Sequence, residues 1–182
     1  EAGGLGSGRA RVEAHVLQQR QARRADRPAV DAGRRHTYEE HAVEPAVAQS
    51  MAWQRLLIAL GGVASGLKGA QTWYVEAHQF RIDTADGIGR PTPEGAHRDG
   101  VDLVVVVLVD RHSVKGGETR VFDAQGPAGQ RFTLVEPWTA LLLDDARMIH
   151  ESTPIQPVAD SGFRDTLVLT YRAGAFQGPP AA

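Results

Sequence analysis

The feature that most constrains the fold is a series of short apolar and β-branched runs that fills the second half of the chain. Each run is bounded by Gly, Pro or Asp, and no helical pattern separates one from the next. The runs cover residues 72–82, 101–109, 118–123, 130–135, 139–143 and 166–172. Many short strands joined by turns are typical of an antiparallel sandwich or jelly roll. We therefore expect a mainly β fold with flanking helices.

The front of the chain has a different character. Residues 1–36 are rich in Gly, Ala, Arg and Gln, and we expect an N-terminal extension that is partly helical or flexible, with a short exposed helix over residues 12–24. Apolar residues at helical spacing between 43 and 64 indicate a supporting helix that buries Trp53 and stops at Gly61-Gly62. Residues 37–182 would then form a single domain.

The composition of the chain argues against several classes of protein. A formal net charge of -2 over 182 residues argues against a nucleic-acid binder, and we interpret the local basic cluster of residues 20–27 as a solvated face. The chain has no cysteine, so any metal must take nitrogen and oxygen ligands. We find no apolar stretch long enough to span a bilayer and no secretory leader, and we expect a cytoplasmic protein.

A His-x-Asp triplet directly precedes the longest valine-rich run. If the backbone is extended there, His97 and Asp99 project to the same side. His150 follows the run over residues 139–143, and in a jelly roll ligands from distant strands can meet at one mouth of the barrel. Two imidazoles and one carboxylate are the facial triad of non-haem iron(II) oxygenases. Alternatively, Asp99-Gly100 is simply a hairpin turn.

The last run opens with a possible anion anchor. Alternation places Arg164 and Thr166 on one face, where a guanidinium and a hydroxyl could bind one carboxylate inside the barrel. 2-Oxoglutarate fits this arrangement, because it chelates iron at one end and carries a carboxylate at the other. The alternative is an ordinary surface pair between Arg164 and Asp165 or another acid.

Four blocks follow one another along the chain. They are His97-Arg-Asp99-Gly-Val-Asp, Val114-Lys-Gly-Gly-Glu118, Leu143-Asp-Asp-Ala-Arg147-Met-Ile-His150-Glu-Ser-Thr-Pro154-Ile and Gly162-Phe-Arg164-Asp-Thr-Leu-Val-Leu-Thr. Together they resemble the bacterial iron(II)/2-oxoglutarate dioxygenase family that includes L-isoleucine 4-hydroxylase. The resemblance implies a double-stranded β-helix (cupin-like) fold, with His97, Asp99 and His150 as iron ligands. It also implies Arg164 as the oxoglutarate anchor, whereas Thr166 rests on a wider Arg-x-Ser/Thr pattern.

The same resemblance implies an activity. It is hydroxylation of an unactivated carbon with Fe(II), 2-oxoglutarate and O2, with release of succinate and carbon dioxide. The favoured substrate is a free L-amino acid or a related small metabolite, and a carrier-bound or peptide substrate is the alternative. Two rival functions remain, an oxygen-independent metal cupin acting as an isomerase or hydrolase, and a jelly-roll binding module without catalysis.

Several further residues are candidates for the site. In a regular strand either His78 or the pair Gln79 and Arg81 faces the cavity, and we favour the pair because Arg81 could bind a substrate carboxylate. Glu94 could meet a substrate ammonium group. Asp144 and Asp145 could orient His150 or simply form a turn.

Overall fold

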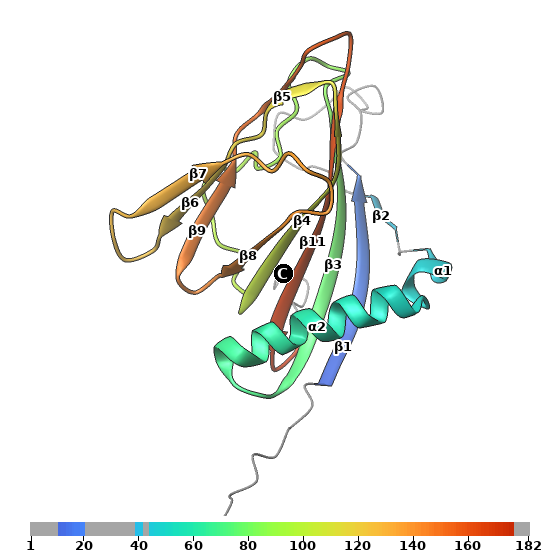
Figure 1. Ribbon diagram of the computed structural model, residues 1–182, viewed down its shortest axis with the longest axis vertical. Coiled ribbons are helices and arrows are strands. Elements are labelled where there is room, and N and C mark those ends of the chain that lie inside the picture. Colours follow the sequence, from blue (N-terminus) through green and yellow to red (C-terminus); the bar gives the residue numbers. More distant parts are fainter. Residues whose placement is uncertain (1–10, 21–38, 42–43, 177–182) are drawn as a thin grey trace, which may run out of the picture.

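The computed structural model of the protein describes residues 11–20, 39–41 and 44–176. Its largest sheet has six strands, and Figure 1 shows the smaller sheet beside it. The strand order of the large sheet is β2 (Glu39–His41), β1 (Arg11–Arg20), β3 (Thr72–Asp83), β11 (Phe163–Ala173), β4 (Leu103–His112) and β8 (Ala140–Asp144). The smaller sheet has the order β7 (Gly129–Phe132), β6 (Thr119–Asp123) and β9 (Met148–Ser152). A third pair joins β10 (Ile155–Pro157) to β5 (Val114–Gly116).

This architecture confirms the predicted jelly roll with flanking helices. All the pairings are antiparallel except that of β1 with β3, which is parallel. Alternate side chains of β4 serve two separate cores, as strand geometry requires. Leu103 and Val105 belong to the core under the long helix, whereas Val104 packs with Val121 of β6 and Leu143 of β8. The valine-rich run therefore lies between two layers.

Two helices precede β3, α1 (Pro45–Ala48) and α2 (Met51–Lys68). Ser50 caps α2 by accepting a hydrogen bond from Trp53 N at 3.2 Å, which satisfies one of the amides that a helix start leaves unpaired. The helix lies across the large sheet (Figure 1) and buries Trp53 and Leu57, so the predicted place of Trp53 in the core is confirmed. Tyr171 of β11 donates its hydroxyl hydrogen to Leu57 O at 3.0 Å and ties sheet to helix.

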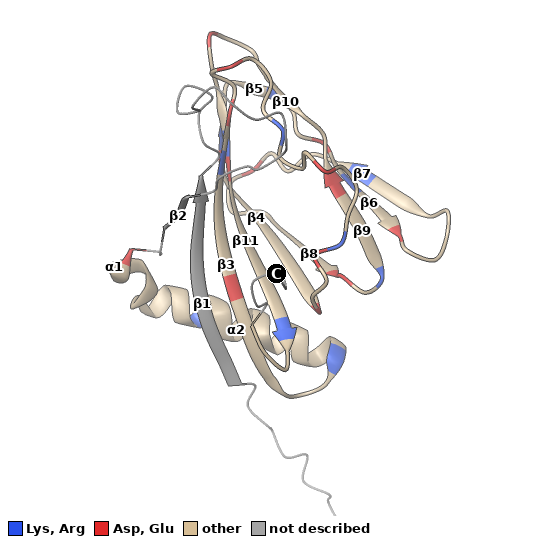
Figure 2. Ribbon diagram, turned by 180° about the vertical axis from the view of Figure 1, so that it is seen from behind, with Lys and Arg blue, Asp and Glu red and all other residues tan. Residues whose placement is uncertain are grey.

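The outer side of α2 is apolar. Figure 2 shows few charged positions on this helix, and its sequence contains only Arg55 and Lys68. Met51, Ile58 and Leu67 expose more than half of their side-chain surface. Within the described ranges, no helix is both long and apolar enough to cross a membrane.

Two predictions for the front of the chain are wrong. Residues 11–20 form strand β1 rather than a helix, and they pair with β3 from Arg11 opposite Thr72 to Gln18 opposite Gln79. The ladder overrides a helix propensity that is only a weak prior. The supporting helix does not stop at Gly61-Gly62 but continues to Lys68 and ends at Gly69, whose φ is +92°. The rest of the predicted extension and of its basic cluster lies outside the described residues.

Candidate metal centre

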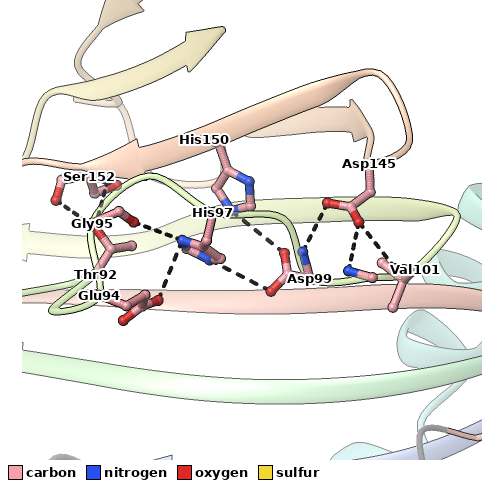
Figure 3. Close-up of polar contacts among 10 residues, drawn as sticks. Thr92, Glu94, Gly95, His97, Asp99, Val101, Asp145, His150 and Ser152 are labelled. Atoms are coloured by element: carbon pink, nitrogen blue, oxygen red, sulfur yellow. Dashed lines mark hydrogen bonds and ion pairs between the residues drawn. The ribbon is translucent and has the colours of Figure 1, made fainter. Parts of the chain in front are cut away.

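The three predicted ligands converge. His97 and Asp99 lie in the loop that leads into β4, and His150 lies in β9, as Figure 3 shows. The loop pairs with β9 through an isolated bridge, in which His97 N donates to His150 O at 3.0 Å and His150 N donates to His97 O at 2.9 Å. One ligand atom from each of the three side chains lies within 4.8 Å of the other two. The two backbones therefore fix the spacing of the two imidazoles.

The protonation of the cluster suits a divalent cation. His97 Nδ1 lies 2.9 Å from Gly95 O, and because a carbonyl only accepts, we assign the proton to Nδ1. Its Nε2 then keeps a lone pair and lies 3.8 Å from Asp99 Oδ1, while His150 Nε2 lies 3.6 Å from Asp99 Oδ2. Burial raises the pKa of Asp99 and lowers the pKa of His150. A bound cation would offset the burial of the carboxylate charge, so the donor set fits iron(II).

Asp145 supports the loop rather than His150. Its side chain is only 2% exposed and accepts hydrogen bonds from the backbone amides of Asp99 (3.1 Å), Gly100 (2.8 Å) and Val101 (3.1 Å). Figure 3 shows the carboxylate aimed at this turn. The alternative of a turn at Asp144 and Asp145 is confirmed, because Arg147 N donates to Asp144 O at 3.0 Å just after the end of β8. The Asp144 side chain accepts from Lys68 Nζ at 2.7 Å.

Thr92 supports the site although no residue pattern predicts it. Its hydroxyl donates to Ser152 O and accepts from Ser152 N, both at 3.0 Å. These two bonds attach the loop before His97 to the strand that carries His150 (Figure 3). Only the tertiary pairing of loop and strand reveals this contact.

Arg164 and Thr166 are buried at the start of β11, with exposures of 3% and 5%. Nε and Nη2 of Arg164 are buried without a hydrogen-bond partner among the described residues. Burial, together with the charge of Arg111, lowers the pKa of Arg164 to about 10, so this guanidinium is still a cation at neutral pH. The alternative of a surface pair with Asp165 is wrong, because Asp165 accepts instead from Arg81 Nε at 2.8 Å.

The predicted orientation of Gln79 and Arg81 is wrong. In the alternation of β3 both side chains project to the same face as Trp73, Val75 and Ala77, which are buried under α2. Gln79 and Arg81 therefore lie on the helix side of the sheet. Arg81 stacks over the ring of Phe163 at 4.4 Å and pairs with Asp165. His78, which lies opposite Val168 in the β3–β11 ladder, shares the inner face with Arg164 and Thr166.

A cleft of about 290 Å³ adjoins the cluster. It is lined by the loop residues before His97, by the residues that follow His150, and by charged side chains of both signs, Arg90, Glu94, Arg120 and Glu151. Glu94 Oε1 also lies 3.4 Å from His97 Nδ1, so this predicted candidate lies between the cleft and the cluster. Arg120 donates to Glu118 at 2.9 Å and to Glu151 at 3.2 Å.

A jelly roll with two imidazoles and one carboxylate at one point defines the class of 2-His-1-carboxylate metal sites. The family model described as 2OG-Fe dioxygenase matches residues 11–170, and the chain belongs to this family. No match was found among curated proteins.

Three solved structures are similar to this chain. A BsmA homologue from Methylobium petroleophilum PM1 is 55% identical with a TM-score of 0.71, and the match covers 78% of this chain and 60% of that one. IDO from Bacillus thuringiensis shares the fold at 19% identity and a TM-score of 0.65, over 75% of this chain and 64% of that one. The Fe(II)/α-ketoglutarate-dependent dioxygenase TqaL is 19% identical with a TM-score of 0.50, over 73% and 60%. The chain thus spans 60–64% of the length of these structures.

Proposed function

We propose that the protein is an iron(II)- and 2-oxoglutarate-dependent dioxygenase that hydroxylates an unactivated carbon of a free L-amino acid or a related small metabolite. The observation that carries this proposal is the coexistence of two features in one barrel. One is the cluster of His97, Asp99 and His150, and the other is the buried cation of Arg164. Family membership supports the same reaction.

Each residue has a distinct task in this proposal. His97 and His150 hold the metal through Nε2 and Asp99 through its carboxylate, while Asp145 keeps the Asp99 backbone in place. Arg164 binds the distal carboxylate of 2-oxoglutarate through its unpaired N–H groups, with Thr166 beside it. When bound, iron(II), 2-oxoglutarate and O2 supply the oxidation, in which R–H, O2 and 2-oxoglutarate give R–OH, succinate and carbon dioxide.

The cleft supports a small zwitterionic substrate. Arg90 offers positive charge to a carboxylate and Glu94 offers negative charge to an ammonium group. Arg120 is already paired with Glu118 and Glu151. A volume of about 290 Å³ lies just below the usual range for sites of drug-sized ligands, as suits a smaller molecule. An amino acid therefore fits both the charge and the size of this cleft.

Anaerobic titration with iron(II) and 2-oxoglutarate tests the co-substrate assignment. We expect the weak visible charge-transfer band of the bidentate chelate in the unaltered protein, no iron binding in Asp99→Ala, and a higher oxoglutarate requirement in Arg164→Met with iron affinity retained. The exposed Arg131→Gln controls for loss of one positive charge. Iron binding without the band would favour the oxygen-independent cupin, and absence of iron binding would favour the binding module.

The substrate class needs a separate assay. Succinate formation is measured aerobically with a panel of L-amino acids, and coupled turnover should appear with at least one of them. Succinate that forms only with compounds lacking an amino-acid group would contradict the substrate class while leaving the dioxygenase assignment intact.

A further inference from the structure

Arg164 has a second arginine directly opposite it. In the β4–β11 ladder Arg164 pairs with Arg111, so both side chains leave the sheet on the inner face. Directly opposed residues in antiparallel strands have Cβ atoms about 5 Å apart. The charge of Arg111 contributes to the lowered pKa of Arg164, which places the two guanidinium groups within electrostatic reach.

Neither arginine forms an ion pair with an acid of the described residues. Arg111 donates to three backbone carbonyls, Leu134 O at 2.8 Å, Gly116 O at 3.2 Å and Val114 O at 3.3 Å. Two like charges side by side on a partly or fully buried face are unfavourable unless an anion joins them. Asp165, the acid next along β11, pairs with Arg81 on the helix side of the sheet.

Two of the three carbonyls that Arg111 binds, Val114 O and Gly116 O, belong to β5, which leads directly into Gly117 beside Arg164. A Cβ atom at Gly117 would lie 3.7 Å from Arg164 Cδ, so the chain just after β5 packs against the Arg164 side chain. Gly116 and Gly117 both have positive φ, which favours glycine at these two positions. By holding Val114 O and Gly116 O, Arg111 fixes β5 relative to β4.

We propose that Arg111 is a second selectivity residue of the co-substrate pocket, which adds a positive charge beside Arg164 and holds β5 and the following Gly117 against it. This inference rests on the proposed binding of 2-oxoglutarate at Arg164. It assigns the preference for a 2-oxo acid with a distal carboxylate to a pair of arginines rather than to one. The pair should discriminate strongly against 2-oxo acids whose far end is uncharged.

The test compares two ligands in several variants. Dissociation constants for 2-oxoglutarate and for 2-oxopentanoate, which has a methyl group in place of the distal carboxylate, are measured anaerobically with the iron-loaded protein. The variants are Arg111→Gln, Arg111→Lys, Arg164→Met and the exposed control Arg131→Gln. We expect Arg111→Gln to raise the dissociation constant of 2-oxoglutarate about tenfold and that of 2-oxopentanoate by less than about twofold. Arg111→Lys keeps the charge but loses the planar fork, so its dissociation constant for 2-oxoglutarate should lie between those of the unaltered protein and Arg111→Gln.

The outcomes are distinct. Equal weakening of both ligands in Arg111→Gln would show a merely structural role and overturn the inference. If Arg164→Met lost selectivity while both Arg111 variants kept it, the inference would also fail and the proposed function would stand. If the unaltered protein bound no 2-oxoglutarate, both would be overturned. If Arg111→Gln does not fold, Arg111→Lys tests the inference through the ratio of its dissociation constants for the two ligands. An unchanged ratio in Arg111→Lys would contradict the role of the planar guanidinium.

Discussion

Arg164 is a buried cation whose charge none of the residues described by the structure neutralises. Burial and the nearby charge of Arg111 lower its pKa to about 10, which corresponds to roughly 3 kcal/mol of destabilisation present at every pH below about 10. Replacing an unpaired buried charge by an apolar side chain of similar length removes this penalty. We expect Arg164→Met to raise the free energy of unfolding by about 1–3 kcal/mol in the absence of ligand.

Chemical denaturation of the two proteins with and without 2-oxoglutarate checks this prediction. The co-substrate should stabilise the iron-loaded unaltered protein, because it binds only the folded state, and should have little effect on the variant. A variant that is less stable than the unaltered protein in the absence of ligand would show that Arg164 has a stabilising partner that we have not identified.

Asp145 gives a second prediction for a single side chain. Asp145→Ala leaves three backbone amides without their acceptor, so we expect a loss of about 2–4 kcal/mol in the free energy of unfolding. Because one of these amides belongs to Asp99, iron affinity should fall by at least about tenfold. The matched control is Asp144→Asn, which alters only the contact with Lys68 and should leave iron affinity unchanged. Equal iron affinity in all three proteins would refute the support role.

Residue patterns predicted part of the site and missed part of it. The spacing of His97 and Asp99 and the position of His150 were enough to predict the cluster, because local chemistry and strand order determine it. Side chains of β3 do alternate between the two faces of the sheet, as predicted. Alternation alone does not say which face a helix covers, and so the choice of Arg81 over His78 for the cavity was wrong. Arg111 was missed because its partner lies more than fifty positions away along the chain.

Helix α2 should matter for stability and not for the metal. Leu57 is 5% exposed and belongs to the core between helix and sheet, whereas its neighbour Ile58 is 59% exposed. We expect Leu57→Ala to lower the free energy of unfolding by about 2–4 kcal/mol, and Ile58→Ala by less than about 0.5 kcal/mol. Thermal unfolding and iron titration of both variants check this. A similar cost for both would show that the outer side of α2 is covered in solution.

Strands and helices differed in how well their patterns predicted them. The runs that became β4 and β11 were recognised because a two-sided core demands apolar residues on both faces. The predicted helix over residues 12–24 failed because nothing local to the segment encodes its ladder with β3. Gly61 does not end α2, because it is buried within the helix and the chain continues in contact with the sheet.

The whole molecule brings the ligands together from two layers. The loop with His97 and Asp99 leads into the six-stranded sheet, whereas His150 belongs to the three-stranded sheet. A bound metal ion therefore links the two layers, which are otherwise joined near the cluster by the bridge between His97 and His150 and by Thr92. Metal binding should accordingly stabilise both layers together.

Anaerobic addition of iron(II) at a hundred times its dissociation constant should stabilise the folded state by about 2.7 kcal/mol. For a domain of this size we expect a rise in Tm of roughly 5–10 °C, reversed by a chelator. Hydrogen exchange should slow in the loop around residues 97–101 and in β9 at the same iron concentration, because one ion holds both. Asp99→Ala should abolish both effects, and the exposed Asp160→Ala should keep them. Protection confined to one of the two segments would mean that the ion binds elsewhere, and that the convergence of the three side chains serves packing rather than metal binding.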